Sequence, residues 1–315
     1  MTRRERIEKT LRFEQPDRPP HFEQTFELAA EAFGIDYPSE DEFARASGSE
    51  LDNLFARTAE IYARTVERFR WDAVTVWRPA FRNEAQYRFL PVLRRTLDPD
   101  VPIGSFIWGG MVSIDSVTDH MQFAIDLAEH PDHVHQWARE MLRSALEHGR
   151  RLVDAGCELI DVASDVAYNS GTFISPRQFG EFITPYAAQL IDSLKRAGAT
   201  VIFHSDGNLM AVMNDILAMA PHALHSIDPM AGMDIARVKQ FTHGRIALIG
   251  NVQCSLLQDG PDEKIIASAK YCLDHGAPGG GYIFSSSNTI FKGLPLRNYL
   301  VMCEYFWKRY GVVCA

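Results

Sequence analysis

Residues 204–206 place a histidine and a carboxylate where an apolar run ends. In the stretch VIFHSDGNL, His204 and Asp206 are separated by a single serine. Residues two apart in an extended chain lie on the same side of the strand, so both side chains are expected to reach one site. Such a pair can bind zinc through nitrogen and oxygen, or a carboxylate can orient an imidazole for acid–base chemistry. The alternative without function is a core histidine with satisfied hydrogen bonds.

Eight short segments are predicted to be strands, and most are followed by a helical pattern. This alternation is typical of repeated βα units with a parallel sheet. It favours an α/β fold with one (β/α)₈ TIM barrel, a single domain over residues 1–315, rather than two doubly wound domains. The predicted strands are His21–Thr25, Asp72–Trp77, Ser105–Gly110, Glu158–Asp165, Ala199–Asp206, Ala223–Pro229, Arg245–Asn251 and Gly281–Asn288.

Helices are predicted where cap residues flank an apolar period. A long helical region, Thr118–Ala155, is interrupted at Pro131. The helix Pro176–Arg196 has Ser175 as its N-cap. Two further helices end at His275 and cover Pro295–Tyr310. The segment Arg78–Asp100 has no clean helical period and is expected to be a long loop over the barrel mouth.

Polar residues recur at the predicted strand ends. Because active sites of such barrels lie at the carboxyl ends of the strands, these residues are candidates for chemistry. Helix capping is the alternative for Asp228 and Asn208. A third metal ligand is expected from Asp161 or Asp165, and the candidate metal set is His204, Asp206 and Asp161. Asp72 opens its strand, and the residues at the strand ends are Glu23, Asp161, Asp165, His204, Asp206, Asp228, Asn251 and Ser285–Asn288.

Composition excludes some classes of partner. The chain carries a net charge of −9 and no long segment rich in Lys and Arg, so no nucleic acid partner is expected. It has no apolar stretch long enough for a membrane span and opens with a charged helical pattern, which predicts a cytoplasmic protein without a membrane partner. The five cysteines are scattered without a CxxC pair, so neither disulfides nor thiolate zinc sites are expected.

Five arginines lie between residues 78 and 95, against one acid, Glu84. On an acidic protein, such a segment could recruit an anionic substrate. A solvated loop is the alternative. Arg78 and Arg82 are the substrate-binding candidates from this segment.

Six motifs in order resemble the uroporphyrinogen decarboxylase superfamily along nearly the whole chain. They are RxxKTLRFExPDRPP, FISPRQFGEFITPY, VIFHSDGN, DPMAGMDIARVK, IALIGNV and PGGGYIFSSSN. The resemblance implies a barrel fold. It also implies either decarboxylation of a porphyrinogen or methyl transfer with a corrinoid protein or a methyl thiol.

The chain departs from both branches of this superfamily. The decarboxylases resemble one another in an arginine-containing motif after the first strand, in an aspartate matched by Asp72, and in a histidine at strand eight. Here no arginine occurs from Pro19 to Ala44, and Asn288 stands at the histidine position. The zinc methyltransferases of the superfamily resemble one another in an HxCG motif and in a second cysteine at strand eight. This chain has HSDG at the first position and Ser285–Ser287 at the second. A bound metal such as zinc would therefore have oxygen and nitrogen ligands.

The resemblance and the residues together predict a methyltransferase that moves a methyl group between a small substrate and a corrinoid protein. The catalytic candidates are His204, Asp72 and Asp165, and the substrate-binding candidates are Glu23, Arg78, Arg82, Asn251 and Asn288. The alternatives are a decarboxylase of a porphyrinogen or another anionic substrate, with Asp72 stabilising a developing cation, and a non-catalytic barrel that binds a tetrapyrrole.

Overall fold

A parallel sheet of seven strands forms the centre of the molecule in this computed structural model, which describes residues 1–79, 84–242 and 244–313. The order β1-β2-β3-β6-β7-β8-β9 follows the chain, with only the small antiparallel hairpin β4–β5 set apart. The strands are β1 (Val74–Val76), β2 (Ile103–Trp108), β3 (Leu159–Ala163), β4 (Ala167–Tyr168), β5 (Gly171–Thr172), β6 (Thr200–His204), β7 (Ala223–His225), β8 (Ala247–Val252) and β9 (Tyr282–Ser286).

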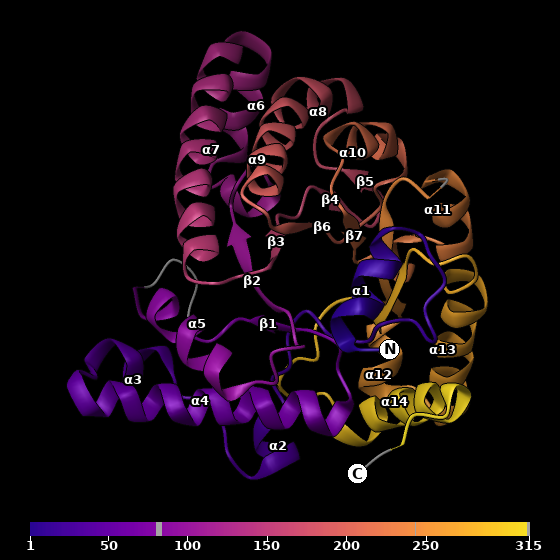
Figure 1. Cartoon of the computed structure of the whole chain (residues 1–315). Helices are drawn as coiled ribbons and strands as arrows, with labels where there is room; N and C mark the ends of the chain where they lie inside the picture. Colours follow the sequence, from indigo (N-terminus) through magenta and orange to yellow (C-terminus); the bar gives the residue numbers. More distant parts are fainter. Residues whose placement is uncertain (80–83, 243, 314–315) are drawn as a thin grey trace.

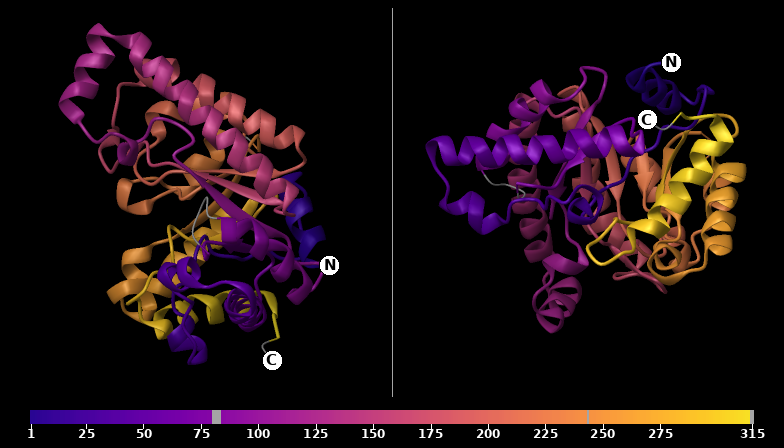
Figure 2. Two further views of the ribbon diagram at one scale, coloured as in Figure 1. Left: turned by 90° about the vertical axis from the view of Figure 1, so that its left-hand side faces the viewer. Right: turned by 90° about the horizontal axis from the view of Figure 1, so that it is seen from below.

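Helices lie around the outside of the curled sheet (Figures 1 and 2). Every residue of β3 and β8 is buried, as expected for parallel strands that are covered on both sides. The α-helices are α1 (Arg3–Leu11), α2 (Ala29–Phe33), α3 (Glu40–Arg45), α4 (Gly48–Phe69), α5 (Glu84–Thr96), α6 (His120–Glu129), α7 (Pro131–Asp154), α8 (Pro176–Phe182), α9 (Thr184–Arg196), α10 (Met213–Met219), α11 (Ile235–Thr242), α12 (Cys254–Asp259), α13 (Asp262–Gly276) and α14 (Leu296–Tyr310).

The predicted first strand, His21–Thr25, is not a regular strand. Its segment lies where the eighth strand of a barrel would lie, because the Phe284 amide donates to the Pro20 carbonyl (2.8 Å) and the Asp72 amide donates to the His21 carbonyl (2.7 Å). Its ladder contacts are single parallel bridges, from His21 to Phe284 and from Phe26 to Ile290. The two prolines before His21 have no N–H to donate, which limits pairing here. The fold is therefore TIM-barrel-like, with a regular sheet that does not close.

The prediction of a long loop over Arg78–Asp100 is also wrong, because the helix α5 occupies Glu84–Thr96. Ala85, Phe89 and Leu93 are buried at helical spacing, while Pro91 inside the helix obscures the pattern in the sequence. Elsewhere the predicted helices are present. Ser175 caps α8 through a capping box, although Pro176–Arg196 forms two helices instead of one because the chain breaks at Ile183, shortly before Pro185.

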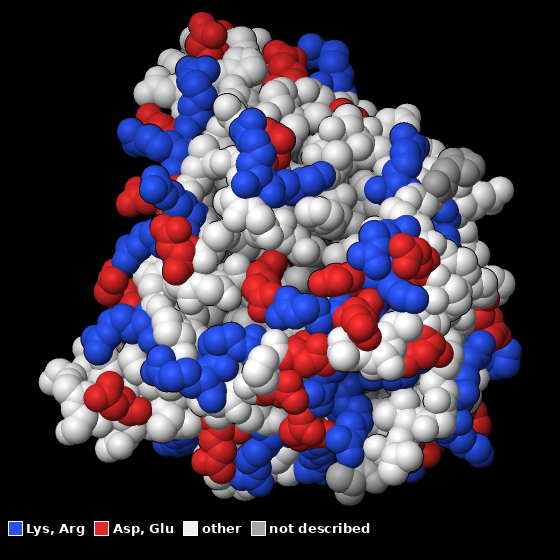
Figure 3. Space-filling model, viewed as in Figure 1, with Lys and Arg blue, Asp and Glu red and all other residues white. Residues whose placement is uncertain are grey.

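Charge on the surface is mixed. On the face shown in Figure 3, Lys and Arg side chains alternate with Asp and Glu and form no extended basic field. Among the described residues, no helix combines the length and the apolar character needed to cross a membrane.

Candidate active site

Strands β3 and β6 bring the predicted chemistry together at their carboxyl ends. Their register places Ala163 opposite His204, so the residues that follow each strand become neighbours. The Asp206 amide donates to Oδ1 of Asp165 at 2.9 Å. Nε2 of His204 lies 3.9 Å from Oδ1 of Asp165 and 4.0 Å from Oδ1 of Asp206. These three residues, which we call the DHD cluster, offer three ligand atoms that all lie within 4.8 Å of one another.

Gly207 allows the chain to turn directly after Asp206. Its φ is +86°, and a Cβ atom placed there would lie 2.3 Å from the carbonyl oxygen of Ala167. The β4–β5 hairpin therefore rests on the glycine backbone, and the Asn208 amide donates to the Tyr168 carbonyl at 2.9 Å. Only glycine fits this close approach without strain.

His225, which the sequence analysis did not single out, orients His204. The two residues are paired in the register of β6 and β7, and their Nδ1 atoms lie 2.7 Å apart. Burial lowers the pKa of His204 to about 3 and that of His225 well below its usual value, so both rings are neutral. A hydrogen bond between two neutral imidazoles needs one Nδ1–H donor and one acceptor. When His204 is the donor, its Nε2 presents a lone pair to the two carboxylates.

Asp206 is an acid in an environment that disfavours its charge. Burial raises its pKa to about 7, and the carboxylates of Asp165 and Asp228 act in the same direction. Its Oδ2 accepts a hydrogen bond from Nδ2 of Asn288, but its buried Oδ1 has no partner. A buried carboxylate oxygen without a donor, beside a second carboxylate, is stabilised by a cation.

The DHD cluster fits a divalent metal on its donor chemistry. Neutral imidazole nitrogen and carboxylate oxygen are both ligands for zinc, and the unpartnered Oδ1 of Asp206 is available. Among the described residues, no cysteine belongs to a cluster able to hold a metal. Asp165, His204 and Asp206 would therefore hold an ion through oxygen and nitrogen alone.

Asp161 does not join this cluster. It lies within β3 opposite Ile202, two residues before the position paired with His204. Its Oδ2 accepts from Nε2 of Gln24 at 3.0 Å, and burial raises its pKa to about 7. Asp165, not Asp161, is the carboxylate that stands beside His204 and Asp206.

Asp72 lies at the other end of the sheet, since it precedes β1, whereas the cluster lies at the carboxyl ends of β3 and β6. Arg6 donates to its Oδ1 at 2.6 Å, and Arg18 donates to its Oδ2 at 2.6 Å. The His21 amide adds a bond of 2.8 Å to Oδ2. Both oxygens of this fully buried carboxylate are occupied, so the structure does not bring Asp72 to the rim where we expected it.

Among the predicted substrate-binding residues that the structure describes, only Asn288 forms a hydrogen bond to the cluster. Glu23 is fully buried and accepts hydrogen bonds from the Ser285 hydroxyl (2.8 Å) and the Ser286 hydroxyl (2.6 Å). The guanidinium of Arg78 pairs with Glu40 and lies 4.7 Å from the centre of the Trp77 ring. Arg82 lies outside the described residues.

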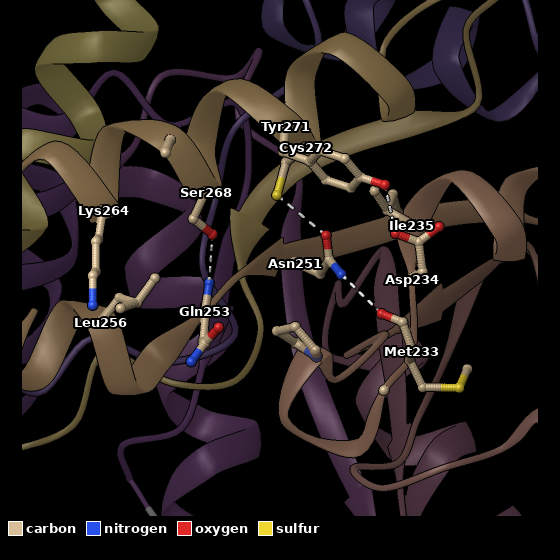
Figure 4. A pocket seen from close by; sticks show the side chains of 13 residues that line it. Met233, Asp234, Ile235, Asn251, Gln253, Leu256, Lys264, Ser268, Tyr271 and Cys272 are labelled. Atoms are coloured by element: carbon tan, nitrogen blue, oxygen red, sulfur yellow. Dashed lines mark hydrogen bonds between the residues drawn. The ribbon is translucent and has the colours of Figure 1, made fainter.

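Asn251 points toward a different pocket, of about 520 Å³, beside α13 (Figure 4). Its amide nitrogen donates to the Ile227 carbonyl at 2.9 Å, and its oxygen accepts from the Cys272 thiol at 3.2 Å. The partners of Asn251 are thus structural groups outside the DHD cluster.

A second pocket, of about 560 Å³, lies against the DHD cluster itself. Two of its lining residues, Asp165 and Asp206, belong to the cluster. The others come from the segment after β2, from the β4–β5 hairpin and from the loop after β6, and they are Ile114, Asp115, Ala167, Tyr168, Asn169, Ser170 and Gly207. A small molecule in this pocket would contact the proposed metal ligands directly.

Known proteins are similar to this chain in sequence or in fold. A uroporphyrinogen decarboxylase from Azoarcus sp. (strain BH72) is 25% identical over 250 residues, which cover 75% of this chain and 67% of that protein. One from Syntrophotalea carbinolica is 24% identical over 264 residues, covering 80% and 74%. A solved structure described as a methyltransferase from Methanosarcina mazei superposes with a TM-score of 0.76 at 19% identity, covering 98% of this chain and 99% of that one.

The family match covers most of the chain, including the candidate site. The profile of the family described as uroporphyrinogen decarboxylase (URO-D) matches residues 56–308. This range contains all three residues of the DHD cluster, as well as His225 and Asn288. The chain therefore belongs to the uroporphyrinogen decarboxylase family.

Proposed function

We propose that the protein is a methyl-transferring enzyme that moves a methyl group between a small substrate and a corrinoid protein. The observation that carries the proposal is the DHD cluster, two carboxylates and a neutral imidazole within 4.8 Å of one another beside a pocket. The methyltransferase from Methanosarcina mazei has the same fold, which is compatible with the proposal.

Asp165, His204 and Asp206 would hold a divalent metal such as zinc. Bound there, the metal would act as a Lewis acid on an oxygen or nitrogen of the substrate. A donor set of oxygen and nitrogen makes a harder site than thiolates do, and it suits a substrate whose methyl group is carried by such an atom.

The chain's own residues prepare this site. His225 holds the ring of His204 through the Nδ1 contact of 2.7 Å. The Asp206 amide fixes Asp165, and Asn288 fixes Oδ2 of Asp206 while Oδ1 remains available. The three ligand side chains are therefore oriented by hydrogen bonds before any ligand arrives, which reduces the cost of ordering them on binding.

Decarboxylation, the activity of the named relatives, is the other candidate function. We assigned to Asp72 the stabilisation of a developing cation in that reaction. Its two oxygens are occupied by Arg6 and Arg18 at the opposite end of the sheet. No observation at the DHD cluster favours a substrate with many carboxylates, because the cluster is itself acidic.

Metal content separates these two functions. We expect about one zinc per chain after loading in the wild type and in Asp161→Asn, and loss of the metal in His204→Ala. With a reduced corrinoid protein and candidate methyl donors, the wild type should change the visible absorbance of the corrinoid and His204→Ala should not. A protein that binds no metal and releases carbon dioxide from uroporphyrinogen would overturn the proposal.

A further inference from the structure

The pocket beside the DHD cluster has a marked charge bias. Its lining includes the carboxylates of Asp115, Asp165 and Asp206, which come from three separate segments of the chain. Among the described residues that line it, none is Lys or Arg. The carboxylate of Asp228, which does not line the pocket, also raises the pKa of Asp206 through charge repulsion.

This bias persists when a metal is bound. A divalent ion held between Asp165 and Asp206 would displace any proton from these carboxyl groups and would balance at most their two negative charges. Asp115 is exposed and is not one of the proposed ligands, so its charge remains. The potential in the pocket therefore stays negative with the metal and becomes more negative without it, and it favours cations over anions in both states.

Tyr168 adds an aromatic surface to the same pocket. Tyr168 is one of the lining residues, and it is 49% exposed. The hydrogen bond from the Asn208 amide to the Tyr168 carbonyl and the close approach of Gly207 hold its backbone in place. An accessible aromatic face beside carboxylates is the arrangement that attracts an organic ammonium ion.

We propose that this pocket binds a small organic cation, and that the methyl-donating substrate is an ammonium compound. Its charged nitrogen would lie against Asp115 and Tyr168, and an oxygen or second nitrogen of the same molecule, which carries the transferred methyl group, would face the DHD cluster. The bond between this atom and the methyl carbon would break, its electron pair would stay on the atom and take up a proton from solvent, and the methyl group would pass to the cobalt(I) of the corrinoid protein. The role of this cation as the substrate rests on the proposed function, whereas the selection of a cation rests on the pocket alone. This selection opposes our earlier expectation of an anionic substrate recruited by Arg78 and Arg82.

Choline and its neutral isostere 3,3-dimethylbutan-1-ol test the charge selection directly. They have nearly the same shape and the same hydroxyl group, and they differ in the charge of the quaternary centre. Binding should be measured by calorimetry or ligand-observed NMR on the full chain, both zinc-loaded and metal-free. We expect choline to bind at least about 10-fold more tightly than the alcohol, with an affinity that falls as salt is added.

Substitutions at exposed positions test which residues select the cation, and they should not destabilise the fold. Asp115→Asn and Tyr168→Leu should each weaken choline about 5-fold and leave the neutral alcohol unchanged. Tyr168→Phe keeps the ring face and should bind choline as the wild type does. Asp52→Asn, an exposed charge on α4 outside the pocket, is the matched control for net charge.

The two proposals fail in different ways. Equal binding of choline and the alcohol, or unchanged choline binding in both Asp115→Asn and Tyr168→Leu, would overturn the cation pocket even if the protein binds zinc and transfers methyl groups. Choline binding that depends on both residues supports the pocket, even if His204→Ala shows that no metal is held and no methyl transfer is found.

Discussion

Nδ1 of His204 lies 2.7 Å from Nδ1 of His225, and both rings are buried. In His225→Ala the ring of His204 loses the partner that fixes its tautomer. We therefore expect zinc affinity to fall about 10- to 100-fold, as for other residues that orient metal ligands. Competition with a chromogenic chelator measures this. His225→Asn should recover part of the affinity, and His133→Ala, at an exposed position on α7, should have no effect.

The pKa of Asp206 predicts how metal binding depends on pH. Burial and the neighbouring carboxylates raise this pKa to about 7, so below that pH the carboxyl group carries a proton that a metal must displace. His204, with a pKa of about 3, adds no competing proton in the same range. Zinc affinity should fall by up to about tenfold per pH unit below pH 7. A midpoint that stays the same in Asp206→Asn would contradict this assignment.

Asp72 is predicted to support the fold and not the chemistry. In Asp72→Asn the guanidinium groups of Arg6 and Arg18 keep their charges and lose their buried counterion. The free energy of unfolding should fall by about 3–5 kcal/mol, as measured by urea denaturation, while the folded protein still binds one zinc. Glu8→Gln, in an exposed pair with Arg12, should change stability by less than about 1 kcal/mol. Loss of zinc binding in folded Asp72→Asn would show that the residue acts at the site.

The buried carboxyl group of Asp161 should make the fold less stable at high pH. Its pKa is about 7 in the folded protein, against 3.8 for the free side chain, so between these values the folded state holds a proton that the unfolded chain releases. The free energy of unfolding then falls as pH rises, by on the order of 1.4 kcal/mol per pH unit. Asp161→Asn removes this loss, and its advantage over the wild type should be larger at pH 8 than at pH 5. An advantage that does not vary with pH would contradict the raised pKa.

The order of elements could be predicted from the sequence, because buried β-branched runs and helix caps are local signals. Ser175 and Gly311 mark helix ends in the sequence, and the structure has α8 beginning and α14 ending there. The helix α5 was missed because Pro91 and the arginines mask its period. The sequence predicts a strand around His21, because the residues of this segment do not show how few ladder hydrogen bonds it forms.

The sequence predicts those site residues whose position depends only on where a strand ends. His204 ends β6, Asp206 follows it and Asp165 follows β3, so all three meet at one rim. The choice between Asp161 and Asp165 depends on the stagger between β3 and β6, which no single strand reveals. His225 ends the short strand β7 with an apolar residue before it, a signal similar to that of His204, and the same reasoning could have found it. Asp72 opens its strand, and that position alone places it at the other end.

Gly207 links two parts of the molecule that have separate roles. Its backbone touches the carbonyls of Ala167 and Tyr168 on one side and follows Asp206 directly on the other. An outward movement of the hairpin that carries Tyr168 would break the hydrogen bond from the Asn208 amide to the Tyr168 carbonyl, and Asn208 belongs to the loop that supplies Asp206. Occupancy of the pocket and of the ion site should consequently be thermodynamically linked, each ligand altering the affinity for the other.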